Sequence, residues 1–573
     1  MTLRTFAACC GVVQLILAAA RPASAQVPVL PYNIGQAVRA AEEAQRGAPQ
    51  PSGTAEAVLP QPVEPPLTLA DKETLFVRRI EVDGPSLVDE KEVREVLSPY
   101  ENRDLTLAEI YKAADKLSTL YRDHGYPVAK AYVPAQDARS GLLRIKLIPG
   151  QYGEIGIKNE SLVRTDYLAR VINPALGTSP FIRTDAVEHA MLLTSDLSAG
   201  TMPQVTIGPG QQQETSDFLF SLPEERRIQG FLLGDNFGSP YTGRLRASAG
   251  LTVNSPLGFG DRFNGYGIVS STTGLVNGRI AYAFPMGFQG ARGELGVFRT
   301  TYVLGGVYNT LDATGTALGF TATITYPIVR QRAANVYIIG NFTSKTLNDK
   351  DLGTSFANRT IDLGMIGVTG ETVGNINGLP LTTATTFSVT KGYVHFPDPA
   401  QREANVESID TAGSYCKINL AFNATLAFNE TLSLTTTLRG QTSFTRSLDT
   451  SEQMTLSGEF GVRSYDEGVS GDSGYLVTPM LKYALPDISL YRHSVGVFTD
   501  VGAAWIDYSS YATTQKSYSQ LNDIGLGYYA TYQYSPARQL LLKALVAHTY
   551  GSDSGLQAYN RGTKGLVQIG LTF

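Results

Sequence analysis

Cysteine is scarce in this chain, and its scarcity excludes one kind of stabilisation. Of three cysteines, Cys9 and Cys10 lie in a predicted leader, so the mature protein keeps only Cys416. A single cysteine forms no intrachain disulfide. We interpret Cys416 as a small apolar strand residue, because a reactive thiol needs an activating neighbourhood.

Concentrated positive charge and long apolar runs are also missing. The formal net charge is −5, without a Lys/Arg cluster interleaved with aromatics, so nucleic acid is not an expected partner. Beyond the leader, no apolar run reaches the ~20 residues that a transmembrane helix needs. The leader itself has a positive start at Arg4, an apolar run over residues 6–20 and the triplet Ala23-Ser24-Ala25, which predicts a signal peptide over residues 1–25.

Recognisable catalytic and metal-binding patterns are absent from the sequence. The five histidines are scattered, without an HExxH or paired Cys/His spacing. Residues 471–474 (GDSG) are similar to a protease nucleophile segment, but Tyr475 follows where glycine is needed, so we assign them to a turn. No GxxxxGK[ST] phosphate loop occurs. We therefore predict no metal, no cofactor, no catalytic residue and no enzyme activity.

The chain is rich in glycine, tyrosine and phenylalanine, with 57, 30 and 23 residues, and this favours many short strands and turns. Between residues 26 and 74, only residues 33–46 carry a helical pattern, and a Pro-rich linker follows. The alternative for this segment is a disordered tail.

Two modules with one element order follow the linker. Residues 75–150 and residues 151–222 each predict strand, helix, helix, strand, strand, which is a structural repeat. In the first module, Thr106 and Glu109 form a capping-box pattern ahead of an apolar helix face. Each module is large enough for a small α+β core.

Strict alternation of apolar and polar residues replaces the helical patterns beyond Arg227. In residues 244–253, for example, leucine, alanine and valine alternate with arginine, serine, glycine and threonine. Long alternating strands with cations on the polar face predict a transmembrane β-barrel over residues 228–573, with roughly 14 to 18 strands. A soluble β-sandwich is the alternative, but it would have shorter strands. The chain ends on alternating residues and Phe573, similar to the terminal strand that outer-membrane barrels present to the barrel-assembly machinery.

Several motifs resemble those of one family, in that family's order. Residues 120–157 resemble the first POTRA (polypeptide-transport-associated) domain of two-partner secretion transporters, the hemolysin secretion/activation (ShlB/FhaC/HecB) family. Residues 234–246 and 254–261 resemble its first barrel strands and hairpin. The POTRA match rests on Tyr121, Gly125, Tyr126, Pro134, Gln136, Gly141 and Gly150.

Two further motifs supply the candidate site residues. Val462-Arg463-Ser464-Tyr465 resembles the family's Val-Arg-Gly-Tyr loop motif, and Phe498-Thr499-Asp500-Val501-Gly502 fits its Phe-x-Asp-x-Gly strand motif. The chain departs from the family at Ser464, where glycine is expected, so the turn differs or strain is accepted.

The resemblance implies a barrel of about 16 strands, two POTRA domains in the periplasm and a plug helix at residues 33–46. It also implies that the loop folds into the lumen, where Arg463 meets Asp500 on the inner wall. The alternative is that both are ordinary lumen charges. The fold class is thus multidomain: a C-terminal transmembrane antiparallel β-barrel preceded by two α+β POTRA domains.

The implied function is export of a secreted partner protein across the outer membrane of a Gram-negative bacterium. The partners are an unfolded exoprotein, outer-membrane lipid and the assembly machinery. Tyr126, Tyr132 and Gln136 are candidate client contacts, although core or turn roles are the simpler interpretation for the two tyrosines. A barrel-assembly insertase, which usually carries more POTRA repeats, and a passive porin, which lacks them, are the alternatives.

Overall fold

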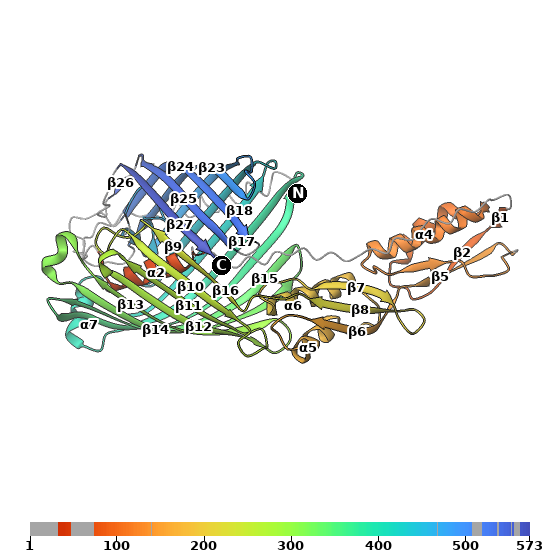
Figure 1. The fold of residues 1–573 in the computed structure, drawn as a ribbon, viewed down its shortest axis with the longest axis horizontal. Coiled ribbons are helices and arrows are strands. Elements are labelled where there is room, and N and C mark those ends of the chain that lie inside the picture. The colour runs from red at the N-terminus through yellow and green to blue at the C-terminus, as the bar shows by residue number, and fades with distance from the viewer. Residues whose placement is uncertain are drawn as a thin grey trace.

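The structure is a computed structural model that describes residues 32–46, 48, 74–138, 140–466, 468–506, 518–535, 538–551, 553–554 and 562–573. The predicted signal peptide and nearly all of the predicted Pro-rich linker lie outside these ranges. Figure 1 shows a large barrel, a short helix enclosed by it, and two α+β units that project from one end. Among the helices in the described ranges, none has the length and apolar character needed to cross a membrane.

The first α+β unit holds a three-stranded sheet with β5 in the middle, parallel to β2 and antiparallel to β4. Its elements are β1 (Thr74–Val77), β2 (Arg79–Asp83), α3 (Glu90–Leu97), β3 (Arg103–Thr106), α4 (Leu107–Asp123), β4 (Lys130–Tyr132) and β5 (Leu142–Ile148). The single strand predicted at the start is two strands, because the chain bends at Arg78 and β1 pairs with β3 instead of joining the sheet.

Helix α4 begins at the predicted capping box. The Thr106 hydroxyl accepts a bond from the Glu109 amide at 3.2 Å, and the Glu109 carboxylate accepts one from the Thr106 amide at 2.9 Å. Ile110 and Leu117 on its apolar face are 4% and 0% exposed. Two amides at the start of the helix are therefore hydrogen-bonded, and the apolar face of the helix packs in the core of the unit.

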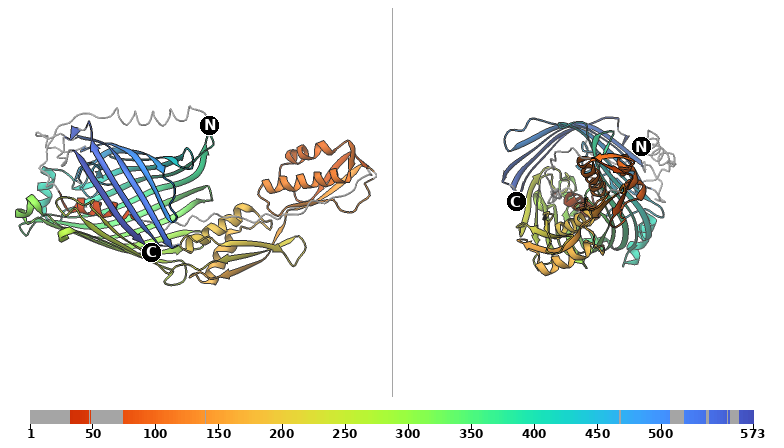
Figure 2. Two further views of the ribbon diagram at one scale, coloured as in Figure 1. Left: turned by 45° about the horizontal axis from the view of Figure 1, so that its top comes forward. Right: turned by 90° about the vertical axis from the view of Figure 1, so that its right-hand side faces the viewer.

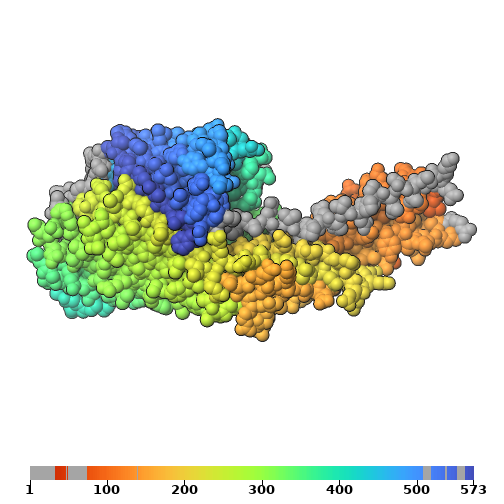
Figure 3. All heavy atoms as spheres, in the orientation of Figure 1, coloured from red at the N-terminus to blue at the C-terminus, as the bar shows by residue number. Residues whose placement is uncertain are grey.

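The second α+β unit repeats this arrangement. Its elements are β6 (Gln151–Asn159), α5 (Thr165–Ala175), α6 (Thr184–Leu197), β7 (Gln204–Pro209) and β8 (Thr215–Leu222), in the sheet order β6-β8-β7. The central strand β8 is parallel to β6 and antiparallel to β7. The predicted order of strand, helix, helix, strand, strand is confirmed for this unit, and the first unit adds to it the separate pair of β1 and β3. Figure 3 shows this unit against the barrel end and the first unit farther out.

Sixteen long strands of the described chain close into an antiparallel barrel. They are β9 (Ile228–Asp235), β10 (Arg246–Asn254), β11 (Arg262–Ser270), β12 (Leu275–Met286), β13 (Ala291–Val303), β14 (Thr314–Arg330), β15 (Ala334–Asp351), β16 (Thr354–Ile376), β17 (Leu379–His395), β18 (Gly413–Ala427), β19 (Leu432–Ser443), β22 (Ser473–Ala484), β23 (Tyr491–Trp505), β24 (Tyr518–Ser535), β25 (Arg538–Thr549) and β27 (Thr563–Thr572); the two-residue β26 (Asp553–Ser554) is attached to β24. Closure matters because an open sheet edge in hydrocarbon leaves backbone groups unpaired.

The barrel faces follow the predicted alternation. On β10, Leu251 is 43% exposed on the outside, whereas Arg246 and Ser248 are 4% and 8% exposed on the inside. Outward side chains elsewhere are similarly apolar, as at Ile366 and Leu526. An apolar exterior around a polar interior is the arrangement of a membrane barrel with a hydrated lumen, so the predicted fold class is confirmed.

The seam between the first and last strands is short. Strand β27 pairs residues 568–572 with residues 231–235 of β9, whereas β27 and β25 pair over ten positions. Phe573 extends the seam, because its amide and carbonyl bond to those of Gly230 at 2.9 Å each. Among the sixteen long strands, this closing pair is the one with the fewest paired residues.

One helix lies inside the barrel and one lies on a loop. Helix α2 (Ile34–Arg46) is enclosed by the strands (Figures 1 and 2), and Ile34 and Val38 pack against Tyr302 and Leu347 of the wall. Helix α7 (Pro399–Glu407) lies between β17 and β18, so the expectation that helices end at Arg227 is wrong. Its N-cap, Asp398, accepts a bond from the Ala400 amide at 2.9 Å. Short 3-10 turns occupy Ser98–Tyr100, Ser271–Thr273 and Gly306–Leu311.

Candidate functional site

A long loop between β19 and β22 folds back against the inner face of the barrel. It carries a two-residue hairpin of β20 (Met454–Thr455) and β21 (Ser470–Gly471). Leu456, Val462 and Tyr465 of the loop are each 0% exposed. They pack with Leu476 of β22 and other wall residues. The loop is thus a packed body with a core of its own, called here the lumen loop (residues 444–472).

Arg463 at the tip of the lumen loop contacts the wall through two guanidinium nitrogens and one face of the guanidinium plane. Its Nη2 and Nε each lie 3.0 Å from an oxygen of Asp500, whose side chain is fully buried. The guanidinium carbon lies 3.9 Å from the ring centroid of Phe498. Paired nitrogens on one carboxylate, with an aromatic face beneath, form a contact that depends on the planar arginine fork.

Gly502 completes the docking strip on β23 because Phe498, Asp500 and Gly502 alternate along one face of the strand. A Cβ atom at Gly502 would lie 2.6 Å from Cδ1 of Leu456 in the lumen loop. Glycine at this position therefore leaves the room that the loop occupies. The strand motif therefore contacts the lumen loop through the ring of Phe498 and the carboxylate of Asp500, and Gly502 leaves space for Leu456.

The neighbours of Arg463 are held by backbone and hydroxyl contacts. The Ser464 amide donates to Asp523 at 2.7 Å, and the Ser464 hydroxyl accepts from Thr549 at 3.0 Å. Ser464 is not among the described residues with positive φ. The turn therefore needs no left-handed residue here, which accounts for serine where the family has glycine. Tyr465 is buried, and its carbonyl accepts from Lys564 at 3.2 Å.

Asp466 is a further loop anchor that sequence reasoning missed. Its carboxylate accepts two bonds from Arg244, at 2.9 and 3.1 Å, and pairs with Lys564 of β27 at 2.9 Å. Arg244 lies two residues before the start of β10, so the two cations stand on either side of the β27–β9 seam. Glu459 of the loop also pairs with Lys543 of β25.

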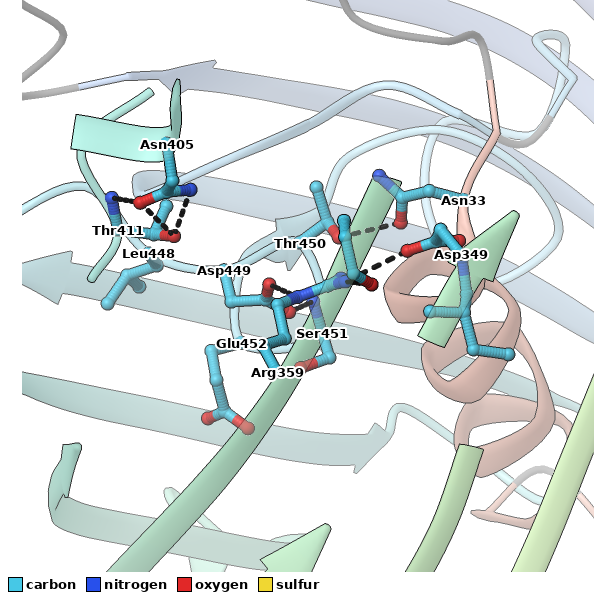
Figure 4. Close-up of polar contacts among 12 residues, drawn as sticks. Asn33, Asp349, Arg359, Asn405, Thr411, Leu448, Asp449, Thr450, Ser451 and Glu452 are labelled. Atoms are coloured by element: carbon cyan, nitrogen blue, oxygen red, sulfur yellow. Dashed lines mark hydrogen bonds and ion pairs between the residues drawn. The ribbon is translucent and has the colours of Figure 1, made fainter. Parts of the chain in front are cut away.

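A second ionic group fixes the first part of the lumen loop to strands β15, β16 and β18, and Figure 4 labels its members Asp349, Arg359, Asp449 and Glu452. Arg359 joins Asp449 of the loop to Asp349 of the wall, with the Asp349 pair at 2.8 Å. Glu452 pairs with Lys345 at 2.6 Å and with Lys417 at 2.7 Å. All these side chains are at least nine-tenths buried within the lumen, where a charge is tolerated when it is paired.

Helix α2 is seated on the same loop. The Ile34 amide donates to Asp349 at 2.9 Å, which places a carboxylate at the positive helix N-terminus. Thr450 donates to the side-chain oxygen of Asn33 at 2.7 Å. Gly35 lies so close that a Cβ would be 2.5 Å from the Ser451 amide. The helix is therefore held partly by the wall and partly by the loop.

The three candidate client contacts lie in the first α+β unit, apart from the lumen group. Tyr126 is 6% exposed, beneath the Arg183 guanidinium at 5.6 Å, so its ring belongs to the core. Tyr132 is half-buried on the edge strand β4. Gln136 is exposed, and its side chain accepts from the Arg144 amide at 2.8 Å and donates to the Arg144 carbonyl at 2.7 Å. These two bonds occupy both side-chain groups of Gln136.

The sequence signals for the missed anchors are partial. Alternation places Lys345, Arg359 and Lys417 on polar strand faces, so their presence in the lumen follows from the pattern. Their partners Asp449 and Glu452 lie in a loop without periodicity. Among the described residues, no group of three or more His, Cys, Asp or Glu is arranged as a metal site.

Comparison with known proteins gives consistent matches. A family model described as "Haemolysin secretion/activation protein ShlB/FhaC/HecB" matches residues 214–527, and one described as "POTRA domain, ShlB-type" matches residues 75–150. The heme/hemopexin transporter protein HuxB of Haemophilus influenzae (strain 86-028NP) is 25% identical over 440 residues, covering 76% of this chain and 77% of its own. The outer membrane transporter CdiB of Dickeya dadantii (strain 3937) is 23% identical over 435 residues, or 70% of each chain.

Solved structures share the fold. CdiB from Escherichia coli superposes with a TM-score of 0.68 at 16% identity, over 95% of this chain and 99% of that one. CdiB from Acinetobacter baumannii does so with a TM-score of 0.60 at 13% identity, over 94% and 97%. The loop and strand motifs described above both fall inside the range that the larger family model matches.

Proposed function

The chain belongs to the haemolysin secretion/activation family (ShlB/FhaC/HecB) of two-partner secretion transporters of the outer membrane, and we propose how it exports its secreted partner. The observation that carries the proposal is the way the lumen is filled. Helix α2 and the lumen loop are held by ion pairs and hydrogen bonds to a polar wall. Each such bond contributes only about 1.5–3 kcal/mol, because it is exchanged for bonds to water, so α2 and the loop can be displaced by breaking these bonds one after another.

The client is proposed to arrive in the periplasm unfolded and to meet the two α+β units first. Each unit has open sheet edges, β2 and β4 in the first and β6 and β7 in the second. An extended segment adds to such an edge through main-chain hydrogen bonds. Tyr132 lies on β4, and Gln136 follows it, so this edge is the proposed first contact.

Transit then requires α2 and the first part of the lumen loop to leave the pore axis, while the tip of the loop stays docked on the wall. The Arg463–Asp500 contact is the proposed anchor about which the loop moves. Folding of the client outside the cell supplies the driving force, because folded protein does not return into the pore. This scheme needs no nucleotide, metal or catalytic group, and we propose that the chain is not an enzyme.

Export and barrel assembly are distinguished by one deletion experiment. The gene for this chain is deleted, and the exoprotein of the neighbouring reading frame is followed in the medium and the periplasm, together with the amounts of other outer-membrane barrels. We expect the exoprotein to vanish from the medium while the other barrels are unchanged. A general loss of other barrels would instead support the insertase function, and continued export would contradict the proposal.

A porin function is tested by the same strains. A passive pore changes the uptake of small solutes and leaves exoprotein export intact. The closed lumen of the described chain, filled by α2 and the lumen loop, favours the transporter over the porin.

A further inference from the structure

Three arginines from the barrel converge on the end of one helix in the second α+β unit. Arg330 at the end of β14 donates to both carboxylate oxygens of Asp196, at 2.9 and 2.7 Å. Arg262 of β11 and Arg292 of β13 donate to the main-chain carbonyl of Asp196, at 2.9 and 2.6 Å. Asp196 is the penultimate residue of α6.

The electrostatics of this contact are favourable at both the side chain and the backbone. The last carbonyls of a helix have no partner within the helix and carry the negative end of its dipole. Arg262 and Arg292 satisfy that end, while Arg330 takes the carboxylate in the paired geometry that arginine favours. The side chains of Arg330 and Asp196 are 14% and 31% exposed, so solvent screens the pair less than a surface pair.

Two glycine turns of the barrel pack closely against α6 beside the arginines. Gly260, in the turn between β10 and β11, has φ of +79°, and a Cβ there would lie 3.0 Å from Cα of Leu197. Gly290, in the turn between β12 and β13, has φ of +84°, and a Cβ there would lie 2.7 Å from Cδ2 of Leu193. Positive φ therefore favours glycine at both positions where α6 packs against the barrel rim. Tyr167 of α5 adds a bond to the Gly287 carbonyl at 2.8 Å.

We propose that Asp196 is a positioning residue that fixes the second unit in one orientation beneath the mouth of the barrel, so that a client strand held by this unit faces the lumen. The contact region is called here the joint. The barrel side of the joint consists of the ends of β11, β13 and β14 that lie next to the second unit (Figures 1 and 3). This positioning role rests on the proposed export function. It assigns to the Asp196 carboxylate the alignment by which the client passes from the second unit into the lumen, a step called here the handover.

The orientation of the joint is measured directly in the full chain. Spin labels are attached at Leu219→Cys, an exposed position on β8, and at Ile488→Cys, in the turn between β22 and β23, in a Cys416→Ser background. Pulsed electron paramagnetic resonance then gives the distribution of distances between the two labels in the absence of client. We expect a narrow distribution for the parent chain and a broad one for Asp196→Asn, with export reduced several-fold.

Matched variants separate this contact from a general loss of charge. Glu160→Gln removes a carboxylate of the same unit from an exposed pair with Lys158, and we expect no change in distance or export. Arg330→Gln should reproduce Asp196→Asn, and the double variant should be no worse than the more severe single variant, because both act through one contact. Additive effects would contradict the proposal.

The outcomes distinguish the joint from the export function. An unchanged distance distribution in Asp196→Asn, or a broad distribution with full export, would overturn the positioning role. If the parent chain exports no exoprotein, the export function fails and the handover role fails with it. Broadening in Asp196→Asn would then still identify Asp196 as the residue that sets the joint.

Discussion

At the scale of single residues, the lumen loop depends on side-chain shape as much as on charge. Arg463 contacts Asp500 through two nitrogens and covers Phe498 with its plane. Lysine carries the same charge at a single point and has no planar face. The two residues are therefore not equivalent at this position.

We expect Arg463→Lys to weaken the docked loop and to reduce export by about tenfold or more. Hydrogen bonds to charged groups contribute about 1.5–3 kcal/mol each, and about 1.4 kcal/mol corresponds to a factor of ten in an equilibrium. The measurement is exoprotein in the medium relative to barrel in the membrane. Arg492→Lys is the matched control, because Arg492 is 75% exposed and lies 3.6 Å from Asp487. Equal export by Arg463→Lys and the parent would show that charge alone is sufficient.

The motifs could be predicted at this scale, but most of their partners could not. The two family motifs predict the contact between Arg463 and Asp500 from sequence alone. Asp523 and Thr549, which hold Ser464, lie in strands whose register against the loop is a tertiary property. No local pattern encodes such a register.

At the scale of elements, helix α4 shows how much local sequence specifies. Its start was predicted from Thr106 and Glu109, and both capping bonds are present. The amide of Thr106 donates to the Glu109 carboxylate, and this bond, as the main cause, lowers the pKa of Glu109 from its ordinary value.

This lowered pKa gives the α4 cap a defined pH dependence. A carboxyl whose pKa is depressed in the folded state adds stability above its unfolded pKa of about 4.3, and that stability is lost as pH falls through the depressed value. We expect the protection of the first-turn amides of α4 against hydrogen exchange, after correction for intrinsic rates, to be constant above about pH 5 and to fall below it. In Glu109→Gln, protection that still falls over the same range would contradict this assignment.

Helix α2 is the element whose removal should change the pore most. Ile34, Ala37 and Val38 are each at most 1% exposed among wall residues. We expect deletion of residues 33–46 to raise single-channel conductance severalfold, because water and ions enter the vacated volume. The control is Glu42→Gln, in a pair with Arg46 that is 42% exposed at Glu42. Unchanged conductance after the deletion would contradict the plug role.

The elements that sequence reasoning missed are short. Strand β3 spans four residues and is stabilised by its partner β1, so periodicity gives little signal. Helix α7 did carry a signal, because Asp398 and Pro399 are typical of an N-cap and a first helical residue. Strand β16 runs for 23 residues, about twice the 9–11 residues that a strand needs to cross a bilayer. Pairing with β15 and β17 extends this strand beyond what a bilayer needs.

At the scale of the whole molecule, the order of parts was predictable because each part has its own periodicity. The contacts between parts were not, because they join residues far apart in the chain. Arg330 and Asp196, at the joint with the second unit, are 134 residues apart. Residues 254–261 resemble a family hairpin, but the contact of Gly260 with Leu197 of α6 is visible only in the fold.

Closure of the barrel provides the last prediction. Phe573 adds two main-chain bonds to a seam of five paired residues, and its ring lies where Gly230 leaves space. We expect removal of Phe573 to lower the unfolding temperature of the barrel, measured as the temperature at which heated samples change from the folded to the unfolded mobility on a gel. We also expect less of this variant in the membrane. Phe573→Tyr is the control, since it keeps the ring and both bonds. Full stability without Phe573 would show that residues 231–235 close the barrel unaided.

Asp466 reaches from within to Lys564 and Arg244, which flank that seam. The lumen loop therefore helps to hold the barrel closed as well as to fill it, and any displacement that breaks the Asp466 pairs removes contacts from both sides of that seam. Opening of the pore and weakening of the β27–β9 seam are then coupled.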